Sequence, residues 1–211
     1  GEVKHFGKIV GTTVVEDDLF KYCKGLCRKY PLEQDKINHW YGVAKELLPV
    51  YVKHWAAHKD VIERTPLLRE QVFDVPYKLP SGRMVRLRGK RDSVDLLGNR
   101  KTAGIYVKEN KTKSQIDQVK IARQMRFDLQ SMLYIVTLKE EMEDAQRSGN
   151  DNWQTKDGRS GWTRYPIKGI TYNVVRRSAH KTVESMMKKV NEDRADGRIG
   201  EWFARWKVDI L

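Results

Sequence analysis

Apolar residues change their spacing along the chain, and each spacing predicts a different kind of element. A short β-like segment lies within residues 1–15, and apolar residues then recur at intervals of three and four, which is typical of amphipathic helices. We expect a helix over about residues 17–30, ended by Pro31, and a longer helix over residues 35–64. Pro49 lies inside the longer run, so that helix should kink or split there.

The spacing then becomes alternating, which is typical of β-strands. Residues 69–98 hold two alternating runs separated by Pro-Ser-Gly at 80–82, a sequence that favours a turn. Residues 103–112, rich in Ile, Tyr and Val, should form a third strand. A helix is expected from about residue 114 or 117 to 147, because this stretch contains no Gly or Pro and returns to helical spacing. It should be the longest regular element.

The last third of the chain is expected to contain a loop, a strand, a helix and a closing strand. These fall at about residues 148–164, 169–177, 181–194 and 201–211. The order of helices, a β-meander, a long helix and a further strand predicts an α/β fold with a central mixed β-sheet flanked by helices. We expect a single domain, with a mainly helical part at residues 1–66 and a core at residues 67–211.

Charged residues stand where these strands should be apolar. Glu109 and Lys111 are two residues apart, so they project from the same face of a strand. Asp92 lies near the end of the preceding strand and can approach Glu109 if the two strands pair. Two carboxylates brought together in a partly buried place repel each other, and a Mg²⁺ ion relieves that repulsion. Asp95 is the rival to Asp92, but its position favours the opposite face of the strand.

The charge of the chain favours a polyanionic partner. Lys and Arg number 41 and Asp and Glu number 28, which gives a formal net charge of +13. An excess of this size in a globular chain most often indicates nucleic acid, although an indifferent basic surface is the alternative. No apolar run is long enough to cross a bilayer. Cys23 and Cys27 are expected to be reduced thiols, since two cysteines cannot complete a metal site.

The basic residues are concentrated around the predicted strands. Residues 83–123 contain twelve basic and four acidic residues, which favours a phosphate-binding surface that ignores base sequence. The residues expected to contact DNA are Arg88, Lys90, Arg91, Lys113, Lys120, Arg123, Arg176 and Arg177. Trp153 and Trp162, in the predicted loop, either stack on unpaired bases or cap the core.

Three short motifs resemble those of the PD-(D/E)XK nuclease superfamily, and especially its RecB-like and Cas4-like exonucleases encoded by phages. Gly89 precedes Asp92 by three positions, Glu109 is followed by Lys111 and Thr112, and Gln130 precedes Tyr134 by four. The resemblance covers about residues 67–211 and implies a restriction-endonuclease-like core. It also implies that Asp92, Glu109 and the main-chain carbonyl of Asn110 bind the metal. Lys111 would position the attacking water, and Gln130 and Tyr134 would face the active site or the DNA backbone.

The resemblance suggests two further ligands and excludes one cofactor. Glu70 matches the upstream glutamate of these nucleases, and His54 is a candidate for the histidine that they often carry on an N-terminal helix. A surface glutamate and a packing histidine are the alternative interpretations of these two residues. The Cas4-like pattern of four cysteines is missing, so no iron–sulfur cluster is expected.

The sequence therefore predicts a Mg²⁺-dependent deoxyribonuclease, with Mn²⁺ able to substitute, that most resembles a phage exonuclease for DNA recombination or processing. Its expected partners are DNA, bound without sequence preference, and a single-strand annealing or recombination protein. The expected location is the cytoplasm of a bacterial host, away from any membrane. The alternatives are a structure-selective or nicking endonuclease with the same fold, a catalytically silent DNA-binding module, and a basic scaffold without chemistry.

Overall fold

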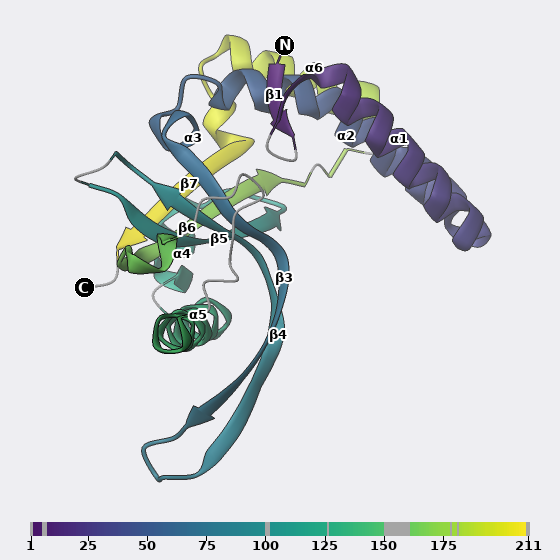
Figure 1. Cartoon of the computed structure of the whole chain (residues 1–211). Helices are drawn as coiled ribbons and strands as arrows, with labels where there is room; N and C mark the ends of the chain where they lie inside the picture. Colours follow the sequence, from purple (N-terminus) through teal and green to yellow (C-terminus); the bar gives the residue numbers. More distant parts are fainter. Residues whose placement is uncertain are drawn as a thin grey trace. The chain divides into compact units, whose positions relative to one another are not determined.

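The structure is a computed structural model, and it describes residues 2–5, 8–99, 102–125, 127–149, 161–177, 179–180 and 182–209 (Figure 1). The chain forms two compact units. One comprises Gly1–Ile62 with Arg177–Trp202, and the other comprises Glu63–Arg176 with Phe203–Leu211. Within the described residues, no helix has the length and apolar character that a membrane crossing requires. Whether the two units together form one nuclease domain stays a prediction.

The first unit is built mainly from helices. A hairpin of β1 (Glu2–His5) and β2 (Lys8–Gly11) leads into α1 (Thr12–Lys29), and a 3₁₀ turn at Pro31–Glu33 separates α1 from α2 (Gln34–Trp55). Helix α3 (Lys59–Ile62), α6 (Val183–Ala195) and a second 3₁₀ turn (Ile199–Glu201) complete the unit. Helix α2 packs against both α1 and α6. The grouping of α6 with the N-terminal helices was not predicted.

The predicted helix boundaries are partly wrong in this unit. Helix α1 begins at Thr12 instead of residue 17, and Pro31 ends it as expected. Helix α2 continues through Pro49 without a break in its assignment and ends at Trp55. The predicted run to residue 64 is therefore too long, because a turn in which the His58 amide donates to the Trp55 carbonyl separates α2 from α3.

The second unit contains a five-stranded mixed sheet, which confirms the α/β class. Its strands are β3 (Arg64–Lys78), β4 (Met84–Leu97), β5 (Gly104–Lys113), β6 (Ile167–Arg176) and β7 (Phe203–Asp209), in that order across the sheet. All neighbours are antiparallel except β5 and β6, which are parallel. A parallel pair needs a crossover connection, and the chain from β5 to β6 supplies it with helices.

The crossover contains two helices instead of the single long helix that was predicted. Helix α4 covers Gln118–Met125, and α5 covers Leu129–Ser148. Asp128 precedes α5 with an extended backbone, and its carboxylate accepts hydrogen bonds from the hydroxyls of Ser131 and Tyr172. These contacts hold Asp128 outside the helix, although the sequence offers no Gly or Pro there. The expectation that this would be the longest element is also wrong, since α2 has 22 residues and α5 has 20.

The core of this unit lies between α5 and one face of the sheet. Its innermost members include Phe73, Val94, Ile105, Val107 and Leu138, each almost fully buried. Trp162, in a short 3₁₀ turn before β6, also belongs to this core and is only 3% exposed. Of the two alternatives for Trp162, core packing is therefore correct and base stacking is wrong. Trp153 lies outside the described residues.

Candidate active site at the fork between β4 and β5

The candidate site lies where β4 separates from β5. The ladder between these strands runs from Leu97 and Gly104 to Ser93 and Lys108 and ends there. Strand β5 nevertheless continues to Lys113, held on its other edge by β6. The backbone edge of β5 that faces β4 is therefore open beyond Lys108. We call this opening the fork.

A side chain takes the place of the missing backbone partner in the fork. The carboxylate of Asp92 accepts a hydrogen bond of 2.9 Å from the main-chain amide of Asn110. The amide and carbonyl of one strand residue point to the same edge, so the Asn110 carbonyl also faces the fork. The side chain of Asn110 also donates from Nδ2 to the Asp92 carboxylate over 3.4 Å, and its Oδ1 accepts a hydrogen bond of 3.1 Å from Nδ2 of Asn173.

Glu109 is the buried carboxylate of the site. It is 4% exposed, and its Oε2 atom is buried without a hydrogen-bond partner among the described residues. Burial raises the pKa of Glu109, the hydrogen bond from Lys111 opposes this shift, and the negative charge of Asp92 adds to it. An unpartnered buried carboxylate oxygen is costly in a folded protein. A cation in the fork would remove that cost.

Lys111 connects this carboxylate to α5. Its Nζ atom lies 2.5 Å from Oε1 of Glu109 and 2.9 Å from Oε1 of Gln130. Gln130 in turn donates from Nε2 to the hydroxyl of Tyr134 over 2.6 Å, and that hydroxyl donates to the carbonyl of Lys90 over 2.8 Å. A continuous chain of hydrogen bonds thus joins the end of β5, one face of α5 and the backbone of β4.

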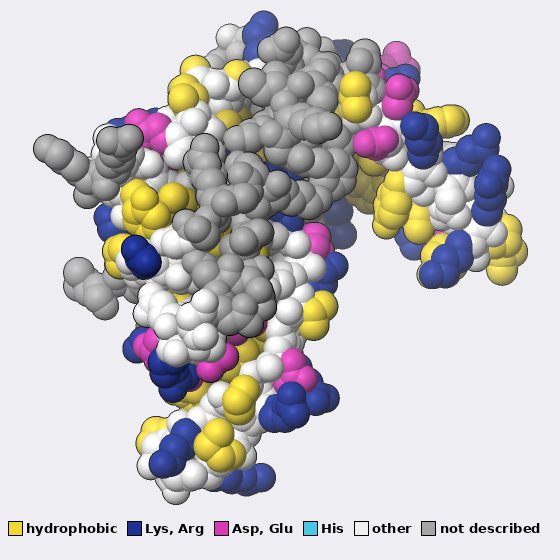
Figure 2. All heavy atoms as spheres, viewed as in Figure 1, with side chains coloured by type: hydrophobic (Ala, Val, Ile, Leu, Met, Phe, Trp, Pro, Cys, Tyr) yellow, Lys and Arg dark blue, Asp and Glu magenta, His cyan; other side chains and the backbone are white. Residues whose placement is uncertain are grey.

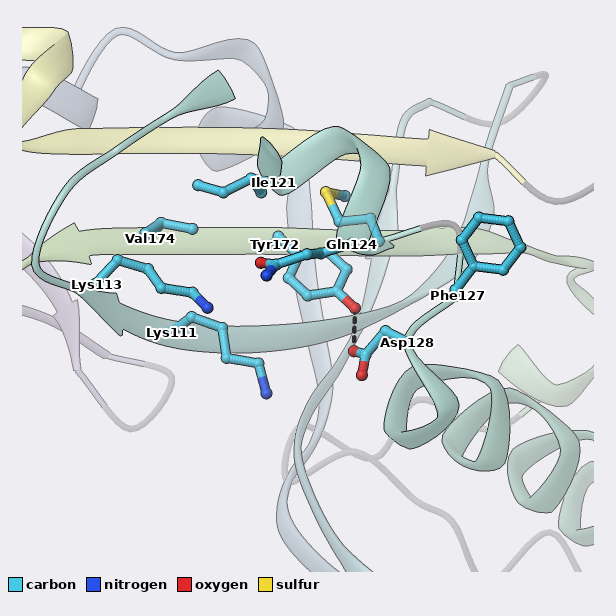
Figure 3. A pocket seen from close by; sticks show the side chains of 9 residues that line it. Lys111, Lys113, Ile121, Gln124, Phe127, Asp128, Tyr172 and Val174 are labelled. Carbon is cyan, nitrogen blue, oxygen red and sulfur yellow. Dashed lines mark hydrogen bonds between the residues drawn. The ribbon is translucent and has the colours of Figure 1, made fainter. Parts of the chain in front are cut away.

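A pocket of about 480 Å³ opens beside Lys111 (Figure 3). It is lined by Lys111, Lys113, Ile121, Gln124, Met125, Phe127, Asp128, Tyr172 and Val174. In the close-up, both lysines project from β5, and the Tyr172 hydroxyl points at the carboxylate of Asp128. Burial acts to raise the pKa of Asp128, but hydrogen bonds from Ser131 and Tyr172 outweigh it, so this pKa is lowered. Asp128 is therefore ionised at neutral pH.

The residues of the fork fit a Mg²⁺ ion. Mg²⁺ is usually held by one or two carboxylates together with waters and phosphate oxygens. Asp92 and Glu109 supply two carboxylates, and Glu109 offers an unpartnered oxygen. No group of three or more His, Cys, Asp and Glu side chains placed to hold a metal occurs in the part of the chain that the structure describes. The donor set thus suits a hydrated ion and not a fully protein-ligated one.

The two further ligand candidates have different surroundings. Glu70 is exposed and forms an ion pair of 2.5 Å with Lys90, and its backbone has a positive φ of 49°. His54 belongs to the other unit, on α2, where its ring packs edge-on against Trp55. The charges of both Glu70 and Asp92 act on Lys90 and raise its pKa, after the hydrogen bond that Lys90 makes to Glu70. The ligand roles of Glu70 and His54 stay predictions.

The prediction that Arg91 contacts DNA is wrong. Its side chain is buried and forms an ion pair with Glu141 on α5, a hydrogen bond of 3.0 Å to Thr137 and a cation–π contact with Phe73. A guanidinium held this way by the core is not available to phosphates. The exposed basic residues Arg88 and Lys90 just before it in the strand concealed this role in the sequence.

The other predicted DNA contacts have varied surroundings. Arg88 forms an ion pair with Asp74, and Lys113 lines the pocket. Lys120 and Arg123 are exposed on α4. Arg176 ends β6, whereas Arg177 belongs to the other unit.

Sequence reasoning did not single out Asp128, and it placed Asp95 on the face of the strand opposite to Glu109, as the register of β4 and β5 confirms. Asp95 is buried, accepts a hydrogen bond of 3.0 Å from Ser93 and forms an ion pair of 3.2 Å with Arg64, so its charge is already matched. Asp128 was overlooked because it lies within a stretch that reads as continuous helix. Its position three residues before Ser131, typical of a helix start, was the available signal.

Comparison with known proteins adds no relative. No protein-family model matches the chain, and a search of curated proteins finds no match either. The resemblance to PD-(D/E)XK nucleases therefore stays a prediction that depends on the motifs and on the geometry of the fork. What the site can do must be inferred from its own residues.

Proposed function

We propose that the protein is a Mg²⁺-dependent nuclease that hydrolyses phosphodiester bonds of DNA, and that it acts as an exonuclease. The observation that carries the proposal is the position of Lys111. Its ammonium lies between the Glu109 carboxylate and the Gln130 amide, beside a buried carboxylate oxygen that has no partner among the described residues. Surface ion pairs on a sheet edge do not need such a buried arrangement.

Each residue of the fork has a chemical role in this proposal. Asp92, Glu109 and the Asn110 carbonyl would hold Mg²⁺, which when bound supplies positive charge to the phosphate. Hydrolysis requires a water to attack phosphorus in line with the departing oxygen. The Lys111 ammonium can hold that water by a hydrogen bond and offset the charge that grows on the phosphate. Gln130 and Tyr134 keep the ammonium in place.

The arrangement of the core supports the same proposal. Three antiparallel strands, a helical crossover and a parallel fourth strand agree with the restriction-endonuclease-like core that the motifs imply. The residues of the three motifs, spread over residues 89–134, converge at one end of one strand. Their convergence is unexpected if the motifs are accidental.

The pocket offers a position for one nucleotide next to the reacting phosphate. Its floor is partly apolar, through Ile121 and Val174, and Lys111 and Lys113 lie along one side. Met125 also belongs to its lining. An apolar floor suits a base or sugar, and the lysines suit phosphate oxygens. A pocket of this size admits a single unstacked nucleotide more readily than a base pair, which favours action at a chain end.

The proposal is tested by digestion of linear and covalently closed circular duplex DNA with Mg²⁺. We expect the wild type to degrade the linear form alone, and Lys111→Ala to abolish degradation. Lys139→Ala is the matched control, since Lys139 is an exposed lysine on α5 that forms an ion pair of 3.7 Å with Glu143. Degradation of closed circles would replace the exonuclease by an endonuclease. Undiminished activity of Lys111→Ala would reject the site, and an inactive wild type that binds DNA would indicate a silent module.

A further inference from the structure

The far part of the β3–β4 hairpin is a two-stranded ribbon. Strands β3 and β4 pair with each other from Gln71 and Arg91 to Lys78 and Met84, whereas β5 pairs with β4 only from Ser93 onward. We call the paired segments 71–78 and 84–91 the ribbon. Figure 1 shows it running past α5 and ending beyond it. At about 3.4 Å per residue, the ribbon is roughly 25 Å long.

The two faces of the ribbon differ sharply in character. Exposure alternates without exception along residues 71–78 and 84–91. The inner face carries Phe73, Val75 and Leu87, and Gly89 makes room for the Phe73 ring, since a Cβ at Gly89 would lie 2.6 Å from Cζ. The outer, exposed face carries Val72, Asp74, Pro76, Lys78, Met84, Arg86, Arg88 and Lys90. The outer face thus has four basic side chains and one acidic side chain.

The single acidic residue on the outer face orients two of the basic side chains. Asp74 lies 2.9 Å from Nε of Arg86 and 3.0 Å from Nε of Arg88, so one carboxylate holds two guanidinium groups side by side. Both arginines stay more than 60% exposed. The pair keeps a net positive charge and is oriented before any ligand arrives. Space-filling atoms show Lys and Arg side chains gathered around the far end of the hairpin (Figure 2).

We propose that the outer face of the ribbon binds the phosphates of B-form duplex DNA. This inference rests on the proposed function and adds a second contact to it, at a distance from the fork. The major groove of B-DNA admits a two-stranded β-ribbon, and one guanidinium group can donate two parallel hydrogen bonds to a phosphate. A basic face with no base-reading pattern would hold duplex of any sequence while an end is processed.

The test is equilibrium binding of a labelled DNA duplex in EDTA, where Mg²⁺-dependent hydrolysis cannot occur, over a series of KCl concentrations. The double variant Arg86→Gln with Arg88→Gln should bind at least tenfold more weakly. The slope of the logarithm of its binding constant against the logarithm of the KCl concentration, called the salt slope, should be smaller in magnitude by about 2. The matched control is Lys139→Gln with Arg147→Gln, which removes the same charge from ion-paired positions on α5 and should bind like the wild type.

Asp74→Asn provides a test of opposite sign. It frees both guanidinium groups, so duplex affinity should rise a few fold, and a merely misfolded variant cannot show that gain. Equal losses in the ribbon and control variants, or no loss in either, would overturn the inference. Stronger ribbon-dependent binding to double-stranded RNA or to anionic vesicles would overturn the choice of DNA. If the ribbon variant binds duplex normally and still hydrolyses DNA, the role of the ribbon is rejected and the proposed nuclease function stands. If binding depends on the ribbon but the wild type does not hydrolyse DNA, the nuclease function is rejected and the ribbon contact stands.

Discussion

Nε2 of Gln130 lies 2.6 Å from the hydroxyl oxygen of Tyr134, one helical turn further along α5. Because the amide nitrogen donates to this hydroxyl, the amide oxygen is directed at Lys111. Tyr134 is itself fixed, since its hydroxyl donates to the Lys90 carbonyl and its ring packs edge-on against Phe73. The orientation of the lysine is therefore set by a residue that does not contact it.

Tyr134→Phe should lower activity without unfolding the protein. The variant removes both hydrogen bonds of the hydroxyl, the one from Gln130 and the one to the Lys90 carbonyl. Loss of the bond that positions Gln130, worth about 1 kcal/mol, predicts a fall in kcat of about five- to tenfold with little change in KM. Steady-state degradation of linear DNA measures both constants. Tyr106→Phe is the matched control, because it removes a similar hydrogen bond to Asp209 and should leave kcat unchanged. A fall in kcat of the same size in both variants would reject a positioning role.

Glu109→Gln should abolish stabilisation by Mg²⁺. A ligand that binds only the folded state raises the melting temperature, so the wild type should melt higher in Mg²⁺ than in EDTA. The variant loses the anionic oxygen that has no partner among the described residues, and its two melting temperatures should coincide. Differential scanning fluorimetry over a Mg²⁺ series gives the result without DNA. An unchanged Mg²⁺ shift in the variant would show that the ion binds elsewhere.

Arg91→Met should destabilise the fold and leave DNA binding alone. Breaking a buried ion pair from one side costs about 3–5 kcal/mol, because Glu141 keeps its charge without a partner. Urea unfolding measures the loss, and the double variant with Glu141→Leu should recover much of it. The salt slope of duplex binding should stay at the wild-type value. A reduced slope would restore Arg91 to the DNA-binding set.

Lys108→Met should stabilise the protein most below about pH 8. Burial, and then the positive charge of Arg64, lowers the pKa of Lys108 from 10.5 to about 8. Between these values the unfolded chain holds a proton that the folded chain has released, so this group makes stability rise with pH there. Below pH 8 Lys108 is charged in the folded chain, so the full free-energy cost of burying that charge is present. The melting temperature should rise by several degrees at pH 7, and the gain should shrink towards pH 10.5. A gain that is independent of pH would contradict this origin.

Gln124→Trp should impair substrate binding by filling part of the pocket. Gln124 is exposed on α4 and lines the pocket, so a larger side chain there need not disturb the core (Figure 3). We expect KM for linear DNA to rise several fold, with a smaller effect on kcat. Gln118→Trp, on the same helix but outside the pocket lining, should behave like the wild type. Equal kinetics for both variants would remove the pocket from the substrate path.

The local part of this structure could be predicted from short-range patterns. Alternation places Glu109 and Lys111 on one face of a strand, and the turn at Pro80–Gly82 makes β3 and β4 neighbours. Helical spacing puts Gln130 and Tyr134 on one face of α5. Each of these relations spans only a few residues, so periodicity decides it.

The features that were missed depend on contacts between distant residues. Arg91 was assigned to the surface, but Glu141, 50 positions later, draws it into the core. The break before α5 is held by Tyr172, a residue of β6 that no local pattern connects to Asp128. Likewise, nothing in the sequence near α6 indicates that it packs on α2. Tertiary contacts override local propensity in all three cases.

Glu70 holds a backbone conformation that glycine would adopt with less strain. Among the described residues it alone combines a side chain with a positive φ, and such a geometry costs on the order of 1 kcal/mol. It sits where the ladder passes from the Arg69–Ser93 pair to the Gln71–Arg91 pair, at the base of the ribbon. The strained residue therefore marks the boundary between the part of β3 that belongs to the sheet and the part that forms the ribbon.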